Sequence, residues 1–463
     1  MDISNNPPHI GDENHNHRHD HVDQRSVEVW EINIERLESM QKNISTTPNL
    51  LTNWSGNNSC SIFRVPHSFV QVNGHSSYHP HIVSIGPFHH GHRDLQMIQQ
   101  HKWRFLGDLI NRTNITLEQL LRSIHPLETK ARDSYSELID LTSDEFIELL
   151  VLDGCFIIEF FRKICKIIPV KTDDPLISMS WVNSFFLRDL IRIENQIPFF
   201  VLQTLFDLTN THQSNRSLSS LALEFFENSI QRPDEILKKY SDLNGKHLLD
   251  LLRKTFIPTD PNLEEPKNSN KIPSHVIQCI SKLRKAGIAI KPGKGESFLQ
   301  VKFRNGTLEM PTITIDAFMI CFIVNCVAFE QCQRTCSKQF TTYTALLDYL
   351  VNTYKDVEYL CEENVIENYF GTDGEVAKLI NNLGKEVSFD LNRCYLSKLF
   401  KEVDDYYKNN WHVTWETFRY SYFSSPWSAI SAFAATLLLI LSLLQTIYAI
   451  LTFYQSPAPG PRL

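Results

Sequence analysis

FIELLVLDGCFIIEFFRKICKII, residues 146–168, is apolar on nearly every side when it is read as a helix. Charged side chains within it, such as Asp153 and Glu159, argue against a membrane span, because ionisable groups are costly in hydrocarbon. Just ahead of this stretch, Thr142 and Glu145 match a capping box, which marks the start of a helix. We therefore predict a central core helix whose charged residues lie at its margins or are paired.

Helical spacing of apolar residues recurs on both sides of this core helix. Pro198 ends one of these helices, since proline fits the first turn of a new helix but not the interior of the old one. No period of about 20 to 50 residues repeats, so a solenoid is not indicated. We expect further helices over residues 95–109, 117–139 with a break near Pro126, 181–193, 218–230, 246–254, 275–286, 315–332, 341–351, 356–363, 374–382 and 396–410.

The clearest strand signal is the stretch 298–310, FLQVKFRNGTLEM, in which Asn305-Gly306 suits a type I′ turn. That turn sets Phe303 opposite Leu308 and Val301 opposite Met310 on one surface, and Lys302 opposite Glu309 on the other. Residues 61–95 mix β-like runs with Gly and Pro, and we read them as loops with one or two short strands. The predicted fold class is mainly α (α+β): a large helical domain with a small antiparallel β-hairpin or sheet, and one C-terminal transmembrane helix.

The transmembrane prediction rests on residues 429–453, AISAFAATLLLILSLLQTIYAILTF, which contain no charge. A helix of about 20 apolar residues crosses roughly 30 Å of hydrocarbon, and this run exceeds that length. Aromatic residues flank it, as is typical of the membrane interfaces, and a buried core helix of this length and apolarity is the rarer alternative. The predicted span is 427–454, with an anchor represented by Trp427, Ala429, Leu438, Gln445, Phe453 and Tyr454.

Four regions follow along the chain. Residues 1–60 are polar and predicted to be mostly disordered, with one short helix at about 27–43; residues 61–425 form the body, and 455–463 a short tail after the span. The N-terminus shows no secretory signal, so we expect a tail-anchored, single-pass protein whose body is cytoplasmic. The plasma membrane and the endoplasmic reticulum are not distinguished.

The amino-acid composition limits the functions that this protein can have. The chain of 463 residues is 42% hydrophobic and 21% charged, the balance of a folded protein. A net charge of −8 without a dense basic stripe argues against nucleic acid as a partner. The ten cysteines follow no disulfide scaffold, and in a cytosolic body they are read as thiols.

Three groups of residues suggest chemistry, and each has a simpler structural interpretation. Histidines that could ligate zinc, copper or nickel gather at His75, His79, His81, His89, His90, His92 and His101, but a polar loop explains them as well. Cysteines lie at Cys321, Cys326, Cys332 and Cys336 without a Cys-x2-Cys knuckle, as buried thiols do. Asp153 with Glu159 or Glu194 could supply the acid and base of a hydrolase, although carboxylates beside core helices usually form ion pairs.

The stretch GIAIKPGKG, residues 287–295, faintly resembles a phosphate-binding loop but does not match the motif. Its glycine spacing is wrong, and Gly295 stands where the motif needs Ser or Thr. We therefore assign no catalytic residue, no metal ligand and no cofactor.

Several segments together resemble the plant-specific domain-of-unknown-function family 247. They are IFRVP at 62–66, VSIGPFHHG at 83–91, VLDGCFIIEFF at 151–161, ENQIPFFVL at 194–202, HLLDLLR at 247–253, FLQVKFRNGTLEMPTITID at 298–316, AFEQC at 328–332, NNLGKEV at 381–387 and the SPW-plus-span ending. The resemblance covers about residues 61 to 454 in order. It implies a mostly helical, membrane-associated plant protein without an assigned enzymatic activity, and some relatives in grasses are implicated in pollen self-incompatibility recognition.

The leading hypothesis is a non-catalytic recognition or signalling adaptor, anchored by its C-terminal helix and binding protein partners through its helical body. The alternative is a membrane-tethered enzyme that acts on a lipid or another membrane-proximal substrate. A deep pocket that unites Asp153, Glu194 and the histidines at 89–92 would favour the enzyme. A third hypothesis is a metal-binding protein.

Overall fold

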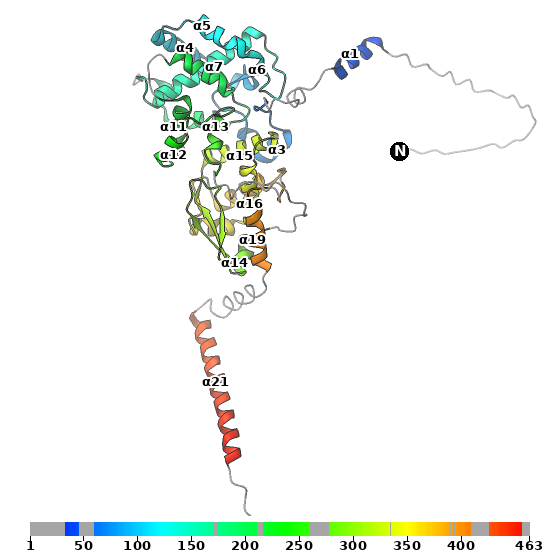
Figure 1. Ribbon diagram of the computed structural model, residues 1–463, viewed down its shortest axis with the longest axis vertical. Coiled ribbons are helices and arrows are strands. Elements are labelled where there is room, and N and C mark those ends of the chain that lie inside the picture. The colour runs from blue at the N-terminus through cyan, green and yellow to red at the C-terminus, as the bar shows by residue number, and fades with distance from the viewer. Residues whose placement is uncertain are drawn as a thin grey trace, which may run out of the picture. The chain divides into compact units, whose positions relative to one another are not determined.

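The computed structural model describes residues 33–45, 60–170, 174–210, 216–258, 277–333, 335–388, 390–391, 394–408 and 426–455 (Figure 1). The chain divides into two compact units, Met1–Pro48 and Asn49–Leu463. In the first, helix α1 covers Ile34–Ser45, which confirms the later part of the helix expected at 27–43. The earlier part of that helix and the polar stretch before it lie outside the described residues.

The core of the second unit is helix α7, Ser143–Ile164, and the predicted capping box of Thr142 and Glu145 is present at its start. Four helices pack around α7: α4 (Gln99–Thr113), α5 (Leu117–Ile124), α10 (Phe199–Thr209) and α11 (Leu218–Ile230). Almost every side chain from Phe146 to Lys163 is buried, because these neighbours cover most of the surface of α7. The central core helix is therefore confirmed.

Shorter helices complete the body, and most match the predicted ranges. They are α3 (His67–Asn73), α6 (Glu128–Arg132), α8 (Pro175–Ser178), α9 (Ser180–Asp189), α12 (Asp234–Lys239), α13 (Leu248–Lys254), α14 (Ile280–Lys285), α15 (Ala317–Cys332), α16 (Gln339–Leu350), α17 (Tyr354–Glu362), α18 (Asp373–Leu383) and α19 (Ser397–Lys408). The helix expected at 117–139 does break at Pro126, within the 3-10 turn η4 (His125–Leu127), but α6 ends at Arg132. The helix expected at 181–193 ends at Asp189, since residues 190–193 form a turn.

The strands expected in residues 61–95 are wrong. This segment holds α3 and a single isolated bridge between Ile62 and Tyr135, followed by three 3-10 turns: η1 (His75–Ser77), η2 (Pro87–His89) and η3 (Arg93–Ile98). The physical reason is that backbone N–H groups between His81 and Gly86 bond to buried side chains instead of to a neighbouring strand.

The predicted hairpin is confirmed, but it belongs to a mixed sheet. Strands β2 (Lys302–Arg304) and β3 (Thr307–Pro311) pair antiparallel, with Lys302 opposite Glu309 and Phe303 opposite Leu308. Asn305 and Gly306 both have positive φ, as a type I′ turn requires. Strand β1 (Ala289–Gly293) pairs parallel to β3. The sequence did not predict this strand, which lies in the stretch that was considered as a phosphate-binding loop. Strand β4 (Ile313–Ile315) pairs parallel to β5 (Ile366–Asn368).

Helix α21 covers Pro426–Gln455, and within it Ile430–Thr452 is long and apolar enough to cross a membrane. This window has a mean hydropathy of 2.1 and none of it is buried. The side chains of Trp427, Leu438 and Gln445 are exposed, whereas those of Ala429, Phe453 and Tyr454 lie outside the described side chains. By length and composition, α21 is a candidate membrane anchor.

Candidate functional site

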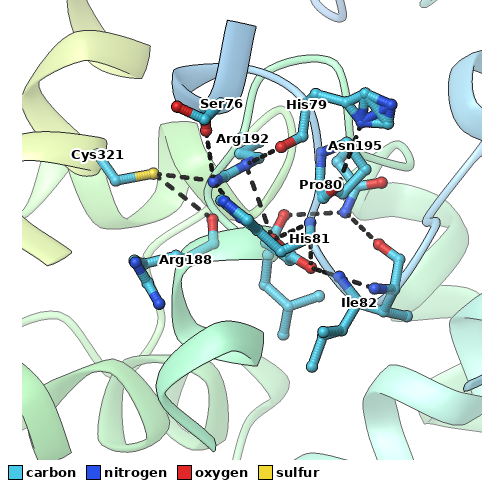
Figure 2. A network of polar contacts seen from close by, with 12 residues as sticks. Ser76, His79, Pro80, His81, Ile82, Arg188, Arg192, Asn195 and Cys321 are labelled. Atoms are coloured by element: carbon cyan, nitrogen blue, oxygen red, sulfur yellow. Dashed lines mark hydrogen bonds and ion pairs between the residues drawn. The ribbon is translucent and has the colours of Figure 1, made fainter. Parts of the chain in front are cut away.

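A buried arginine joins three parts of the body (Figure 2). Arg192 is 1% exposed and lies in the turn after α9. Its guanidinium donates to the carbonyl oxygens of His79 at 2.7 Å and Ser76 at 2.8 Å, and its Nη1 lies 3.4 Å from Sγ of Cys321 on α15. Arg192 therefore links the 76–81 loop and α15 to its own turn, as a structural cation.

Two side chains near Arg192 hold the next part of the loop. The carboxylate of Asp189 accepts from the backbone N–H groups of residues 81, 82 and 83 at 2.8–3.1 Å. Asn195 accepts from the N–H of Ile85 at 2.7 Å and donates to the carbonyl of Val83 at 3.0 Å. A loop without regular secondary structure thus has its backbone groups satisfied, which buried peptide groups need.

Asp153 is the centre of a second set of contacts, and both of its oxygens are occupied. Oδ1 lies 2.5 Å from Nζ of Lys102, which also donates to the carbonyl of Ser84, and Oδ2 accepts from the N–H of Gly86 at 2.8 Å. Gly86 has a φ of 76°, and a Cβ there would overlap the carbonyl oxygen of Gln196. Glycine is required at this position, and Asp153 fixes it in place.

The other two carboxylates that suggested acid and base chemistry are also paired. Glu194 accepts from the N–H of Val65 at 2.8 Å and from Arg64 at 3.0 Å, and lies 3.2 Å from Nε2 of His89. Burial raises the pKa of Glu194, but the contacts with His89, Val65 and Arg64 outweigh it, so the pKa lies below its usual value. Glu159 is bound by two arginines, Arg112 at 2.6 Å and Arg162 at 2.8 Å.

Four of the predicted histidines do come together. The ring centre of His79 lies 4.7 Å from that of His75, 4.6 Å from His89 and 4.9 Å from His92. Burial, with the neighbouring imidazoles, lowers the pKa of His79 to about 4. Within the described ranges, however, His, Cys, Asp and Glu side chains nowhere form a group of three that is arranged to hold a metal ion.

The four cysteines do not converge on a ligand-binding centre either. Cys321 Sγ contacts Arg192, and Cys326 is fully buried in α15. Burial raises the pKa of every one of the four thiols, and those of Cys332 and Cys336 lie at about 12. Packing in the apolar interior accounts for these raised pKa values, because burial disfavours the charged thiolate.

A surface groove of about 570 Å³ lies where α4, α5 and α7 diverge. Its volume falls within the roughly 300–1,000 Å³ that is typical of ligand pockets. The buried side chains of Leu106, Ile147, Val151 and Leu152 line it, together with the exposed Trp103 and Leu117, the half-buried Leu121 and the exposed polar residues Arg122, His125, Asp144 and Glu148. None of the acid, base or metal candidates from the sequence lies in this groove.

A larger cleft of about 990 Å³ lies beside the sheets and is lined by residues of α11, α12, β4 and β5. Several of its charged groups are already engaged within the protein. Arg232 is paired with Glu227, Glu296 with Lys239 at 2.5 Å, and Asp316 caps α15 by accepting from the N–H of Met319 at 2.7 Å.

The sequence contains a signal for the groove that periodicity alone passes over. Trp103 lies off the helix face on which Leu95, Ile98, Phe105 and Leu109 face the core, and it is 45% exposed. The helical period of the core residues does not account for a large aromatic at this position.

Comparison with known proteins identifies relatives across nearly the whole chain. The profile of a family described as "plant protein of unknown function", DUF247, matches residues 62–441. The UPF0481 protein At3g47200 of Arabidopsis thaliana is 37% identical over 433 residues, which are 88% of this chain and 90% of the relative. A second UPF0481 protein of that plant, At3g02645, is 25% identical over 486 residues, 83% of this chain and 89% of the relative. No solved structure matches the chain.

Proposed function

Because the chain belongs to DUF247, a family of plant proteins of unknown function, we propose that it is a membrane-tethered adaptor that binds other proteins through its folded body. The observation that carries the proposal is the contrast in how charged groups are used. Asp153, Glu159 and Glu194 are buried and paired with cations or backbone donors, as groups that stabilise a fold are. The groove between α4, α5 and α7 instead presents apolar and charged side chains to solvent.

The membrane part of the proposal is supported by α21. Its window Ile430–Thr452 contains no charged residue, and Trp427 at one end is 79% exposed, as an aromatic at a membrane interface would be. In the proposed topology the body lies on the cytoplasmic side of the membrane and the C-terminal tail crosses it.

Alkaline carbonate extraction and protease protection test this topology. Full-length protein with an N-terminal tag, expressed in plant cells, is expected to stay in the membrane pellet, and protease added to intact microsomes should remove the tag. A chain that ends at residue 425 should be soluble. Release of the full-length protein by carbonate, or a protected tag, would contradict the anchor or its orientation respectively.

Proximity labelling from the same N-terminal tag tests the adaptor itself. The control is residues 409–463 fused to the tag, which carries the anchor without the body. We expect a set of proteins enriched by the full-length chain over this control. Equal labelling by both would contradict the adaptor, and so would substrate turnover by the purified protein that Asp153→Asn abolishes without unfolding it.

A further inference from the structure

The groove between α4, α5 and α7 is built by one continuous face of α7. Asp144, Ile147, Glu148, Val151 and Leu152 recur at helical spacing, so they lie along one side of its N-terminal half. Of these, the apolar residues are buried and the two acidic residues are exposed. The floor of the groove is therefore an apolar stripe with carboxylates along its edge.

The opposite walls are also helical and apolar. Trp103 and Leu106 are three residues apart on α4, and Leu117 and Leu121 are four apart on α5. Trp103 is 45% exposed and Leu117 is 43% exposed. Three helix faces thus border a trough of about 570 Å³ whose apolar walls are incompletely covered.

The rim of the groove is acidic. Arg122, which also lines the groove, is paired with Glu118 on α5 at 2.8 Å, and this exposed pair partly offsets its charge. Asp144 and Glu148 have no ion-pair partner among the residues that the structure describes. Asp144 lies in the first turn of α7, where a negative charge is favoured by the helix dipole, but Glu148 lies beyond that turn and gains little from it.

We propose that this groove binds a basic amphipathic helix of a partner protein, with Lys or Arg beside its apolar face. The inference rests on the proposed adaptor function and specifies its partner chemistry. Helices recognised in this way insert apolar side chains at i, i+3, i+4 and i+7 into a trough between helices. The free carboxylates of Asp144 and Glu148 attract cationic side chains and disfavour anionic ligands such as fatty acids or phospholipid headgroups.

Fluorescence anisotropy with two designed peptides tests the proposal. Each peptide has about 18 residues, a length of about 27 Å, with Leu along one helical face. One carries Lys beside that face and its twin carries Glu at the same positions. The full-length protein is held in phosphatidylcholine nanodiscs, and empty nanodiscs measure adsorption of the peptide to lipid. The Lys peptide is expected to bind with a Kd of roughly 10 µM, and its Glu twin at least about tenfold more weakly.

Matched variants locate the binding. Trp103→Ala and Glu148→Lys should each weaken the Lys peptide about tenfold or more. Trp181→Ala removes a Trp of similar exposure on α9, and Glu358→Lys reverses an exposed charge on α17, so neither should change the affinity. Glu148→Lys should also improve binding of the Glu twin, which simple loss of folding cannot do.

Three results would overturn the groove assignment: no saturable binding of the Lys peptide above empty nanodiscs, equal affinity for both peptides, or equal loss in Trp103→Ala and Trp181→Ala. These results concern the groove alone. If proximity labelling still separates the full-length chain from the anchor control, the adaptor function stands and its surface lies elsewhere. If labelling fails while the peptide binds, the groove is real and the cellular role is wrong.

Discussion

The loop network around Arg192 and the groove beside α7 use charged side chains in opposite ways. In the network, Arg192, Asp189 and Asp153 are at most 1% exposed, and each meets several internal partners. In the groove, Trp103 and Glu148 face solvent. A charge that is buried and paired positions the chain, whereas a charge left at an apolar edge can be used by a partner.

This difference bears on the residues from which the enzyme hypothesis started. Asp153, Glu194 and His89 do lie in one part of the molecule, as that hypothesis required, because loop 81–90 is held against residues 189–196. Their proximity arises from the need to satisfy an irregular buried backbone, and neither the groove nor the larger cleft is lined by them. Clustering of titratable residues therefore has to be weighed against what each one already binds.

The largest expected effect comes from removing the network's arginine. Arg192→Leu leaves the carboxylate of Asp189 without its nearby cation and two carbonyl oxygens without their donor. Breaking a buried charge network in this way costs about 3–5 kcal/mol, so the free energy of unfolding should fall by that amount in urea titrations. Arg192→Lys, which keeps the charge, should recover part of the loss. A decrease below about 1 kcal/mol would contradict the structural role.

The next largest loss of stability is expected at the Lys102–Asp153 ion pair. A double-mutant cycle there measures the interaction between the two side chains. Asp153→Asn leaves the ammonium of Lys102 buried without a counter-charge, which should cost roughly 3 kcal/mol. Adding Lys102→Met removes that isolated charge, so the double variant should be more stable than the sum of the two single variants predicts. Additive losses, measured by the same urea titrations, would show that the two groups act independently.

Acidification should destabilise the fold, because the buried His247 and the half-buried His79 bind protons more weakly in the folded state. His247 is fully buried, its Nδ1 accepts from the N–H of Asp250 and its other nitrogen meets the carbonyl of Ser61. Burial lowers the pKa of His247 to about 4, as it does for His79 beside His75, His89, His92 and Glu194.

The two lowered histidine pKa values determine how stability changes with pH. The unfolded chain takes up protons near pH 6.5 and the folded chain only near pH 4, so the stabilisation is complete above about pH 6.5 and is lost as the pH falls towards 4. His247 alone accounts for roughly 3 kcal/mol. His247→Gln, itself less stable at pH 7, should show a flatter dependence of stability on pH over this range. An unchanged slope in that variant would rule His247 out as the source.

Groove substitutions should have the smallest effect on stability. Trp103→Ala and Leu117→Ala remove side chains that are already 45% and 43% exposed, so each should change the free energy of unfolding by less than about 1 kcal/mol. Trp181→Ala is the matched reference at 47% exposure. A loss of more than about 2 kcal/mol in Trp103→Ala alone would place this tryptophan in the core and remove it from the binding surface.

The sequence predicted the helices well where an apolar period and a cap coincide. The capping box of Thr142 and Glu145 starts α7 as expected, and Asn305-Gly306 sets the register of the hairpin. It could not predict β1, since parallel pairing of Ala289–Gly293 with Thr307–Pro311 depends on a contact that no local pattern encodes.

At the candidate sites, too, the local sequence predicted which element a residue belongs to, but not which distant residues it contacts. The sequence placed Asp153 and Glu159 in a core helix with partners, and the structure confirms this. The partners themselves, Lys102 and Arg112, come from α4, and the loop that Asp189 binds lies about a hundred residues earlier, so only the fold shows them. The groove needs three helices to exist and was not predicted.

Hydrogen–deuterium exchange of the full-length protein in nanodiscs, with and without the Lys peptide, tests the division between network and groove most directly. The peptide should protect backbone amides in α4, α5 and the first half of α7, while residues 75–92 and 189–196 exchange equally with and without it. Protection centred on residues 75–92 and 189–196, with α5 unchanged, would show that the loop network is the binding site and that its charges are not solely structural.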